Sequence, residues 1–343
     1  MYDTAVRHTT TNPAVRAEGL GKRFGDLWAL RDLDLEIPAG TVLGLLGHNG
    51  AGKTTAIRIL TTLALPSSGS AVVAGHDVAT AADQVRRRIG VASQQATVDG
   101  LLSARRNLVL VGRLHGLAKT EALRKADQLL GQFDLEDAAD RLAKHLSGGM
   151  RRRLDLAASL VADPTVLFLD EPTTGLDPRS RGDLWDVLRD LVRGGTTILL
   201  TTQYLDEADR LADDVVVLDH GRTVAHGTPD ELKAEIGGDR VEVAVGSPAE
   251  LPAVVDATRR FASRAATVDE HERTATIPVA AGVRLMDVLR AIDDAGIDAL
   301  DVNRRQATLD DVFLTLTDPG ADRPDDDRGS DRRVSDESIE AIA

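Results

Sequence analysis

The feature that most constrains this chain is the octapeptide at residues 47–54, Gly-His-Asn-Gly-Ala-Gly-Lys-Thr. It fits the pattern G-x-x-x-x-G-K-[ST] of phosphate-binding loops. The apolar run at 41–46 predicts a buried strand before the loop, and apolar side chains at 57, 59, 60 and 63 predict a helix over 54–63 after it. The loop therefore stands between a strand and a helix, where this pattern binds nucleoside triphosphates.

The residue types of the loop suit a polyphosphate. Glycines let backbone N–H groups curl round phosphate oxygens, and the N-terminus of the following helix adds partial positive charge. We expect Lys53 to reach the β- and γ-phosphates and the Thr54 hydroxyl to ligate Mg²⁺. The predicted nucleotide-binding residues of this segment are Gly47, His48, Asn49, Gly50, Ala51, Gly52, Lys53, Thr54 and Thr55.

Bulk composition bounds the function classes. A chain of 343 residues with 42% hydrophobic residues can form one main domain and a smaller unit. The net charge of −14 disfavours a nucleic-acid-coating surface, and the absence of cysteine excludes disulfides and thiolate metal sites. No apolar run approaches the ~18 residues of a membrane span, and residues 1–13 lack the apolar core of a signal peptide. We expect a cytoplasmic protein that needs a partner for any role at a membrane.

The patterning of the first two thirds of the chain predicts an α/β P-loop NTPase fold. Residues 1–14 read as a flexible leader, and residues 15–237 as a nucleotide-binding domain that opens with antiparallel strands. A helical insert at about 96–145 interrupts the α/β core. The all-apolar run at 165–169 predicts a buried parallel strand.

A second, smaller domain is expected after Gly237-Gly238. The order strand–helix–strand–strand–helix–strand predicts a small α+β domain of split βαβ type over residues 238–318. A closing helix with Leu309, Val312 and Phe313 on one face ends it. Residues 319–343 are rich in Asp, Arg, Gly and Ser and predict a disordered tail.

Two carboxylates follow the apolar strand at 165–169. A carboxylate at such a strand end, downstream of a phosphate-binding loop, is where Mg²⁺ is expected, and Asp170 suits this task. Glu171 could polarise a water for in-line attack on the γ-phosphate. The alternative, that both acids merely open a loop before Pro172, is disfavoured by the presence of both the strand and the phosphate-binding loop.

A serine and two glycines precede a helix predicted over residues 151–161. The Ser147 hydroxyl and the amides of Gly148 and Gly149 could form a second anion cradle. Taken alone, this tripeptide is also a common turn and helix cap. Its position between the phosphate-binding loop and the strand-end carboxylates favours the functional interpretation.

Over about residues 15–235 these motifs resemble the nucleotide-binding subunit of an ABC transporter. The resemblance implies ATP and Mg²⁺ as cofactors and a head-to-tail dimer in which each ATP contacts the signature motif of the other copy. It makes Gln94 the glutamine that senses Mg²⁺ and the transmembrane partner, and Asp177 a D-loop residue. Phe24 falls where the adenine-stacking aromatic sits, although a core position is an equal alternative. The signature motif would comprise Leu146, Ser147, Gly148, Gly149 and Met150, with Met where Gln is usual.

One position departs from the family pattern. The family usually has a histidine after the Thr-Thr that follows the strand at 196–200, and here the residue is Gln203. A glutamine amide can donate a hydrogen bond, but it cannot carry a proton or a charge. We therefore expect Glu171 and Gln203 to support retained but slower hydrolysis. The eight histidines show no metal-ligand spacing, and we interpret them as surface or satisfied side chains.

Three segments, residues 147–157, 201–208 and 308–314, resemble the daunorubicin-resistance exporter ATPases, the DrrA family. The resemblance implies drug export with a separate membrane permease of ABC-2 type, on the inner face of the cell membrane. In that branch the C-terminal segment helps the ATPase work with its membrane subunit, so 309–314 could have this role. A helix packed on its own domain explains those residues equally well.

Two other functions are considered. A regulatory ATP-binding switch with little turnover is suggested by Gln203. A soluble ABC ATPase acting on nucleic acid or the ribosome would usually carry two cassettes or a coiled-coil insert. The single cassette and the negative net charge disfavour that function, and we expect no nucleic acid partner.

Overall fold

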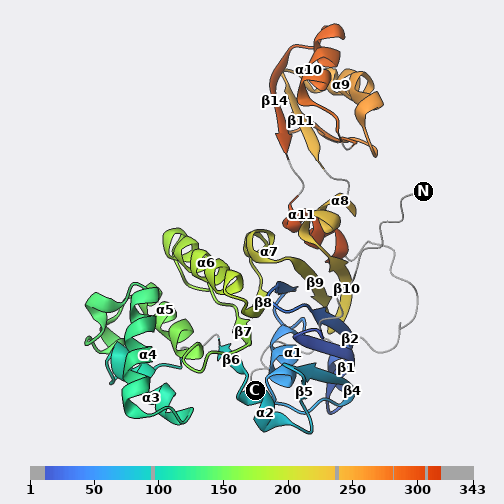
Figure 1. Ribbon diagram of the computed structural model, residues 1–343. Helices are drawn as coiled ribbons and strands as arrows, with labels where there is room; N and C mark the ends of the chain where they lie inside the picture. The colour runs from blue at the N-terminus through green and yellow to red at the C-terminus, as the bar shows by residue number, and fades with distance from the viewer. Residues whose placement is uncertain (1–11, 94–96, 236–238, 281, 306–307, 318–343) are drawn as a thin grey trace, which may run out of the picture. The chain divides into compact units, whose positions relative to one another are not determined.

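The computed structural model describes residues 12–93, 97–235, 239–280, 282–305 and 308–317. Contacts divide the chain after His226 into two compact units, which are described separately. Figure 1 labels the helices and strands of both units.

A six-stranded sheet forms the centre of the first unit, with the strand order β10-β9-β3-β8-β7-β6. Strands β6, β7, β8, β3 and β9 pair in parallel. Every residue of β3, β7 and β8 is buried, which explains their apolar character. The members are β3 (Val42–Leu46), β6 (Ile89–Ala92), β7 (Val166–Asp170), β8 (Thr197–Thr202), β9 (Asp214–Asp219) and β10 (Arg222–Gly227).

The register of this sheet places three strand ends at one edge. Leu46, the last residue of β3, pairs with Thr202 of β8, and Asp170 at the end of β7 pairs with Thr201. The phosphate-binding loop leaves β3 at this edge. Parallel pairing therefore brings the two strongest sequence motifs together, although they lie more than 110 residues apart.

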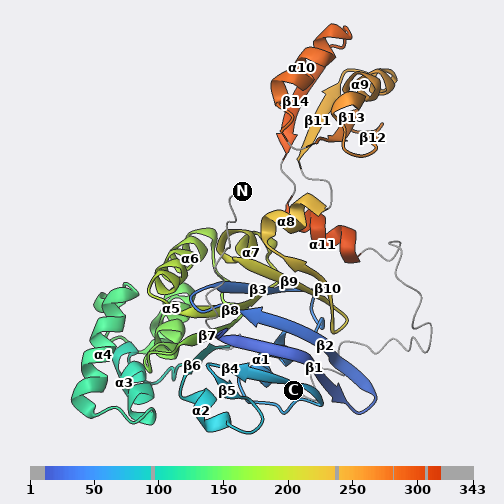
Figure 2. The ribbon, with the colours of Figure 1, turned by 45° about the vertical axis from the view of Figure 1, so that its right-hand side comes forward.

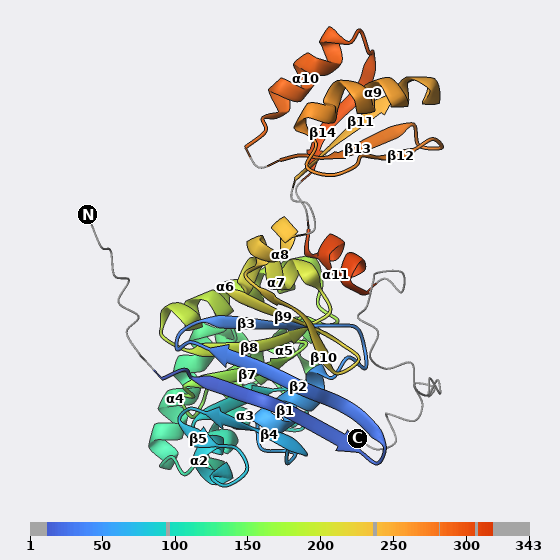
Figure 3. The same cartoon turned by 90° about the vertical axis from the view of Figure 1, so that its right-hand side faces the viewer.

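A second, antiparallel sheet lies beside the first and has the order β2-β1-β4-β5 (Figure 3). One hydrophobic core joins this sheet, the central sheet and α1, and it includes Leu30, Ile37, Leu45, Ile59 and Phe168. The elements are β1 (Val15–Phe24), β2 (Leu27–Ile37), β4 (Ser68–Val73), β5 (His76–Asp77), α1 (Lys53–Leu60) and α2 (Ala82–Arg86).

The helical insert predicted at about 96–145 holds α3 (Ala104–Leu114) and α4 (Lys119–Gln132), which contact each other and α5 (Gly148–Ser159). Their shared core contains Leu108, Phe133 and Leu154, each fully buried. Helices α6 (Pro178–Arg193) and α7 (Leu205–Leu211) follow β7 and β8 (Figure 1). Short 3₁₀ turns at Glu136–Ala138 and Ala143–His145 lead back from α4 towards α5.

Two predicted helix boundaries are wrong. Helix α1 ends at Leu60, because Thr62 has a left-handed φ of 65°, and Leu63 lies beyond the helix with 71% of its surface exposed. Helix α5 begins at Gly148, not at Arg151. Ser147 caps it by accepting a hydrogen bond of 3.2 Å from the Met150 N–H, so the two glycines form its first turn.

The second unit begins at Gly227 and contains the expected split βαβ arrangement. Its antiparallel sheet has the order β12-β13-β11-β14, and α9 and α10 contact each other on one face of it (Figure 2). The elements are β11 (Arg240–Val245), α9 (Leu251–Thr258), β12 (Thr267–Asp269), β13 (Thr274–Pro278), α10 (Leu285–Asp294) and β14 (Ala299–Arg305), with 3₁₀ turns at Pro248–Glu250 and Arg259–Phe261.

This unit starts about ten residues before the domain boundary expected from Gly237-Gly238. The reason is that α8 (Pro229–Glu235) contacts α11 (Leu309–Thr317), which links residues before the glycine pair to the end of the unit. The closing helix predicted at 308–316 is thus present as α11. Across the described residues of both units, every helix is too short or too polar to cross a bilayer.

The shared core of the helical insert supports a stability prediction. Phe133→Ala removes a fully buried ring and should lower the free energy of unfolding of the first unit by about 3–5 kcal/mol. Leu114→Ala, at a position 77% exposed on α3, is the control and should change it by less than about 0.5 kcal/mol. Denaturant unfolding of both variants measures this, and equal effects would contradict the assigned core.

Candidate nucleotide site

The phosphate-binding loop has a backbone that its glycines make possible. Gly52 has a φ of 107°, and a Cβ there would lie 2.6 Å from the Ala29 carbonyl oxygen. Gly50 has a φ of 83°, a left-handed conformation that side chains disfavour. Gly52 also precedes α1 without a side-chain cap, which leaves the first N–H groups of the helix available to an anion.

Lys53 points back into the loop. Its Nζ donates to the Gly47 carbonyl at 2.7 Å and to the His48 carbonyl at 3.2 Å, and the side chain is 6% exposed. Burial lowers the pKa of Lys53 below its ordinary value, against the opposing attraction of Glu171 and Asp170. The two carbonyl oxygens that accept from this ammonium are neutral. A phosphate bound in the loop would add the negative charge that they do not carry.

The Asp170 carboxylate joins three elements. Its Oδ1 accepts a hydrogen bond of 2.6 Å from the Thr201 hydroxyl on β8, and its Oδ2 accepts one of 3.2 Å from the Thr54 hydroxyl on α1. Asp170 is 8% exposed. The Thr54 hydroxyl and the buried Asp170 carboxylate are oxygen donors of the kind that Mg²⁺ prefers.

Glu171 lies beside this pair. Its Oε1 is 3.8 Å from Lys53 Nζ, and its Oε2 accepts a hydrogen bond of 3.2 Å from Thr174. Its φ of 48° is left-handed, and its N–H donates to both the carbonyl and the hydroxyl of Thr201. The strained backbone is thus held by β8, which aims the carboxylate at the loop lysine.

Arg152 on α5 is a residue that the sequence reasoning did not select. Its guanidinium donates to the carbonyls of Ser93 at 2.6 Å, Pro172 at 2.7 Å, Glu171 at 3.1 Å and Asp170 at 3.2 Å. The side chain is 10% exposed. The run of three arginines at 151–153 gave no signal that the middle one would turn inward.

Asp155, one turn along α5, makes the complementary contacts. Its Oδ1 accepts hydrogen bonds from the Thr97 N–H at 2.7 Å and the Thr97 hydroxyl at 2.5 Å, and its Oδ2 lies 3.5 Å from Arg152. The two side chains therefore hold Ser93 and Thr97, the residues on either side of the segment 94–96. Gln94 itself lies outside the described residues.

The signature residues lie at the start of α5. Ser147 and Gly148 are exposed, Leu146 is buried, and Gly149 and Met150 are partly covered. A Cβ on Gly149 would lie 2.9 Å from Ser180 Oγ, so this glycine packs against the first turn of α6.

Asp177 caps α6 by accepting from the N–H groups of Arg179 and Ser180. The hydrogen bonds from Ser180 hold the pKa of Asp177 below its ordinary value. Among the remaining candidates, Phe24 is 38% exposed at the end of β1, so the core alternative for it is wrong. Gln203 is exposed just after β8.

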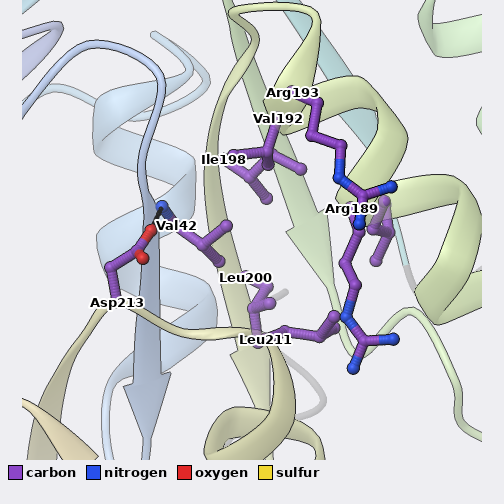
Figure 4. A pocket seen from close by; sticks show the side chains of 9 residues that line it. Val42, Arg189, Val192, Arg193, Ile198, Leu200, Leu211 and Asp213 are labelled. Carbon is purple, nitrogen blue, oxygen red and sulfur yellow. Dashed lines mark hydrogen bonds between the residues drawn. The ribbon is translucent and has the colours of Figure 1, made fainter.

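A pocket of about 220 Å³ lies elsewhere on the first unit (Figure 4). Val42 and Ile198 line it near the beginnings of β3 and β8, whereas the phosphate-binding loop follows the end of β3. Its one carboxylate, Asp213, accepts a hydrogen bond of 2.8 Å from the Val42 N–H. This pocket is therefore not the nucleotide site.

Each of the two units matches a known protein family. The family described as "ABC transporter" matches residues 30–174, and "ATP-binding protein DrrA1-3-like, C-terminal domain" matches residues 227–317. The daunorubicin resistance ATP-binding protein DrrA2 of Streptomyces coeruleorubidus is 54% identical over 305 residues, which are 89% of this chain and 95% of the relative. This chain belongs to the DrrA family of ABC transporter ATP-binding proteins.

A second DrrA relative supports this assignment, and a solved structure supports the ABC cassette fold. The daunorubicin/doxorubicin resistance ATP-binding protein DrrA of Streptomyces peucetius is 45% identical over 338 residues, 97% of this chain and 99% of the relative. Among solved structures, cbiO1 from Clostridium perfringens, part of the ABC transporter complex cbiONQ, has a TM-score of 0.61 at 28% identity. That alignment covers 66% of this chain and 92% of cbiO1.

Family membership fixes the general activity of this DrrA-family chain. It is an ATP-binding, ATP-hydrolysing subunit of an ABC transporter. Subunits of this kind dimerise and work with membrane permeases.

The inward position of Arg152 generates a prediction. Arg152→Met leaves four carbonyls without their guanidinium partner, two of them on Glu171 and Pro172, the strand-end loop that follows β7. Because this loop loses its support, the kcat of ATP hydrolysis should fall at least about tenfold, with a smaller change in KM. Arg152→Lys should recover only part of the rate. Arg153→Met is the matched control, since Arg153 donates to one carbonyl, that of Phe133. Equal losses for the two methionine variants in a phosphate-release assay would contradict this role.

Proposed function

We propose that this chain powers the export of an anthracycline-type drug, using ATP bound at residues 47–55 and hydrolysed at Glu171. The observation that carries the proposal is the buried Asp170, which joins Thr54 and Thr201 beside Glu171. The drug class rests on the names of the relatives, which refer to daunorubicin and doxorubicin resistance.

Nucleotide binding is assigned to the whole loop. Gly47, His48, Asn49, Gly50, Ala51, Gly52, Lys53, Thr54 and Thr55 surround the phosphates, and the uncapped N-terminus of α1 supports this role. Lys53 would exchange the Gly47 and His48 carbonyls for phosphate oxygens, a favourable exchange because both the ammonium and the phosphate are charged. The exposed ring of Phe24 would stack on the adenine.

Mg²⁺ fits the oxygen donors of Thr54 and Asp170, with Gln94 as a further ligand. When bound with ATP, the ion neutralises charge on the β- and γ-phosphates. The 3.2 Å hydrogen bond between Thr54 and Asp170 supports this assignment, because it shows that the two oxygens lie close enough to bind one ion. The hydrogen bond from Thr201 orients the carboxylate.

Glu171 is assigned as the residue that orients and polarises the attacking water. Its 3.8 Å separation from Lys53 Nζ supports this role, since it places the carboxylate at the phosphate end of the loop. Gln203, exposed after β8, would contact the γ-phosphate through its amide. That amide can donate a hydrogen bond but cannot gain or lose a proton, so we expect slower turnover than with histidine.

The dimer is proposed to be head-to-tail. Ser147 and Gly148 are exposed at the start of α5, a helix of 12 residues whose first N–H groups can bind an anion held by a second copy. The remaining signature residues, Leu146, Gly149 and Met150, would position this contact. Asp177, packed through Ser180 against Gly149, would transmit closure between the two copies.

The membrane partner is proposed to be a separate permease of ABC-2 type, which would place this chain on the inner face of the cell membrane. The helical insert offers exposed apolar side chains for that contact: Leu101 is 72% exposed, Leu110 43% and Leu114 77%. Arg152 and Asp155 connect this insert to the segment around Gln94 and to the strand-end loop. Movement at the permease would in this way reach the hydrolytic residues.

The role of Glu171 predicts a separation of binding from turnover. Glu171→Gln should lower phosphate release at least about a hundredfold while ATP still binds, because the amide cannot accept a proton from water. Phosphate release in membranes containing the permease measures this. Glu121→Gln, an exposed glutamate in the first turn of α4, is the control. Phosphate release that is independent of Glu171 would leave the ATP-binding switch as the better function.

Whereas Glu171→Gln should slow ATP hydrolysis, a substitution at Gln203 is predicted to speed it up. Gln203→His should raise kcat several-fold, because an imidazole can share a proton with the γ-phosphate. The test is the steady-state ATPase rate beside that of Gln203→Ala, which should be slower than the unchanged chain. If the histidine variant turned over at the original rate, this position would not limit hydrolysis.

A further inference from the structure

Three potential metal ligands meet beside the phosphate-binding loop. His48 lies in the loop, and Asp219 and His220 lie where β9 ends and the turn to β10 begins. Their ligand atoms all lie within 4.8 Å of one another, the one such group of three among the described residues. His48 Nε2 is 2.9 Å from Asp219 Oδ1, and His220 Nε2 is 3.8 Å from the same oxygen.

Each ring nitrogen of His48 faces an oxygen acceptor, and a neutral imidazole has only one N–H to donate. His48 Nδ1 lies 2.5 Å from the Asn49 carbonyl oxygen, which can only accept, so Nδ1 carries a hydrogen. In a neutral imidazole the lone pair is then on Nε2, which faces the Asp219 carboxylate at 2.9 Å. Two acceptors at this distance require a proton or a metal ion between them. Metal-ligating histidines usually donate their second nitrogen to a carbonyl, as here.

The burial of the three side chains suits an ion that enters from solvent. Asp219 is 7% exposed and supplies a negative charge at the base of the group. His48 is 38% exposed and His220 76% exposed, so the outer side is open to water. A nearly buried carboxylate is stabilised by a cation, and an open outer side leaves a coordination position for water.

Two of the three separations between ligand atoms lie near the value for a tetrahedral ion. Bonds of about 2.0 Å to Zn²⁺ separate the ligand atoms by about 3.3 Å. The separations of 2.9 and 3.8 Å lie on either side of this value, so small side-chain rotations would equalise them. Two imidazoles and one carboxylate select zinc and neighbouring transition metals over Mg²⁺, which prefers oxygen donors.

We propose that His48, Asp219 and His220 bind a zinc-type transition-metal ion that ties the phosphate-binding loop to the β9–β10 turn. The backbone already connects these segments, since the Gly221 N–H donates to the Ala51 carbonyl at 3.0 Å. The ion would fix His48, whose own carbonyl accepts from Lys53. This site is separate from the Mg²⁺ ligands Thr54 and Asp170 and does not depend on the proposed transport function.

The experiment is a zinc titration of the nucleotide-free chain against a chromophoric chelator. We expect one Zn²⁺ per chain, bound at least tenfold more weakly by His48→Asn and by His220→Asn. His226→Asn is the matched control, because His226 also pairs with a carboxylate, Asp214 at 2.7 Å, but has no third ligand within the described residues. Zinc binding of equal strength in all four chains would overturn the proposal.

A second measurement does not depend on the variants remaining folded. Co²⁺ added to the unchanged chain should produce the visible absorption of a tetrahedral nitrogen and oxygen site, and excess Zn²⁺ should remove it. Absence of that absorption at saturating Co²⁺ would overturn the proposal. Glu171→Gln should bind Zn²⁺ as tightly as the unchanged chain does. Zn²⁺ binding therefore tests the metal site alone, and phosphate release tests the ATPase assignment alone.

Discussion

The carboxylate of Asp170 is the interaction on which the rest of the site depends. It accepts hydrogen bonds from Thr201 on the neighbouring strand and Thr54 on the helix after the phosphate-binding loop. A carboxylate only 8% exposed is costly without such partners, and charge-assisted hydrogen bonds of this kind contribute about 1.5–3 kcal/mol each. One side chain thus joins β7, β8 and the start of α1 in a single arrangement directly before Glu171.

Helix α5 adds a second constraint to the same place. Arg152 donates to carbonyls on both sides of Glu171, and Asp155 accepts from Thr97. Because α5 also shares a core with the helical insert, a movement of the insert would pull on the strand-end loop. In the proposed head-to-tail dimer, α5 would therefore connect a second copy, through Ser147 and Gly148 at its start, to the insert and to the loop around Glu171.

The sequence was sufficient for the parts that depend on local pattern. The loop at 47–54 and the apolar strand before Asp170 were predictable, because parallel strands are buried on both faces and phosphate loops need particular glycines. The ends of α1 and α5 were not, since a left-handed Thr62 and the capping by Ser147 are decided by a few hydrogen bonds and backbone angles. The inward turn of Arg152 depends on carbonyls from two distant segments. The meeting of His48 with His220, 172 residues away, likewise follows only from the pairing of β3 with β9.

In the proposed dimer, the phosphate-binding loop is half of a site that a second copy completes. Sedimentation of the chain carrying Glu171→Gln, with and without saturating ATP, tests it most directly, because slow hydrolysis preserves the ATP-bound state. We expect the mass to double with ATP, and not to double when Ser147→Arg is added, since the arginine side chain would cover the exposed start of α5. A chain that binds ATP yet keeps the mass of a single copy would contradict it.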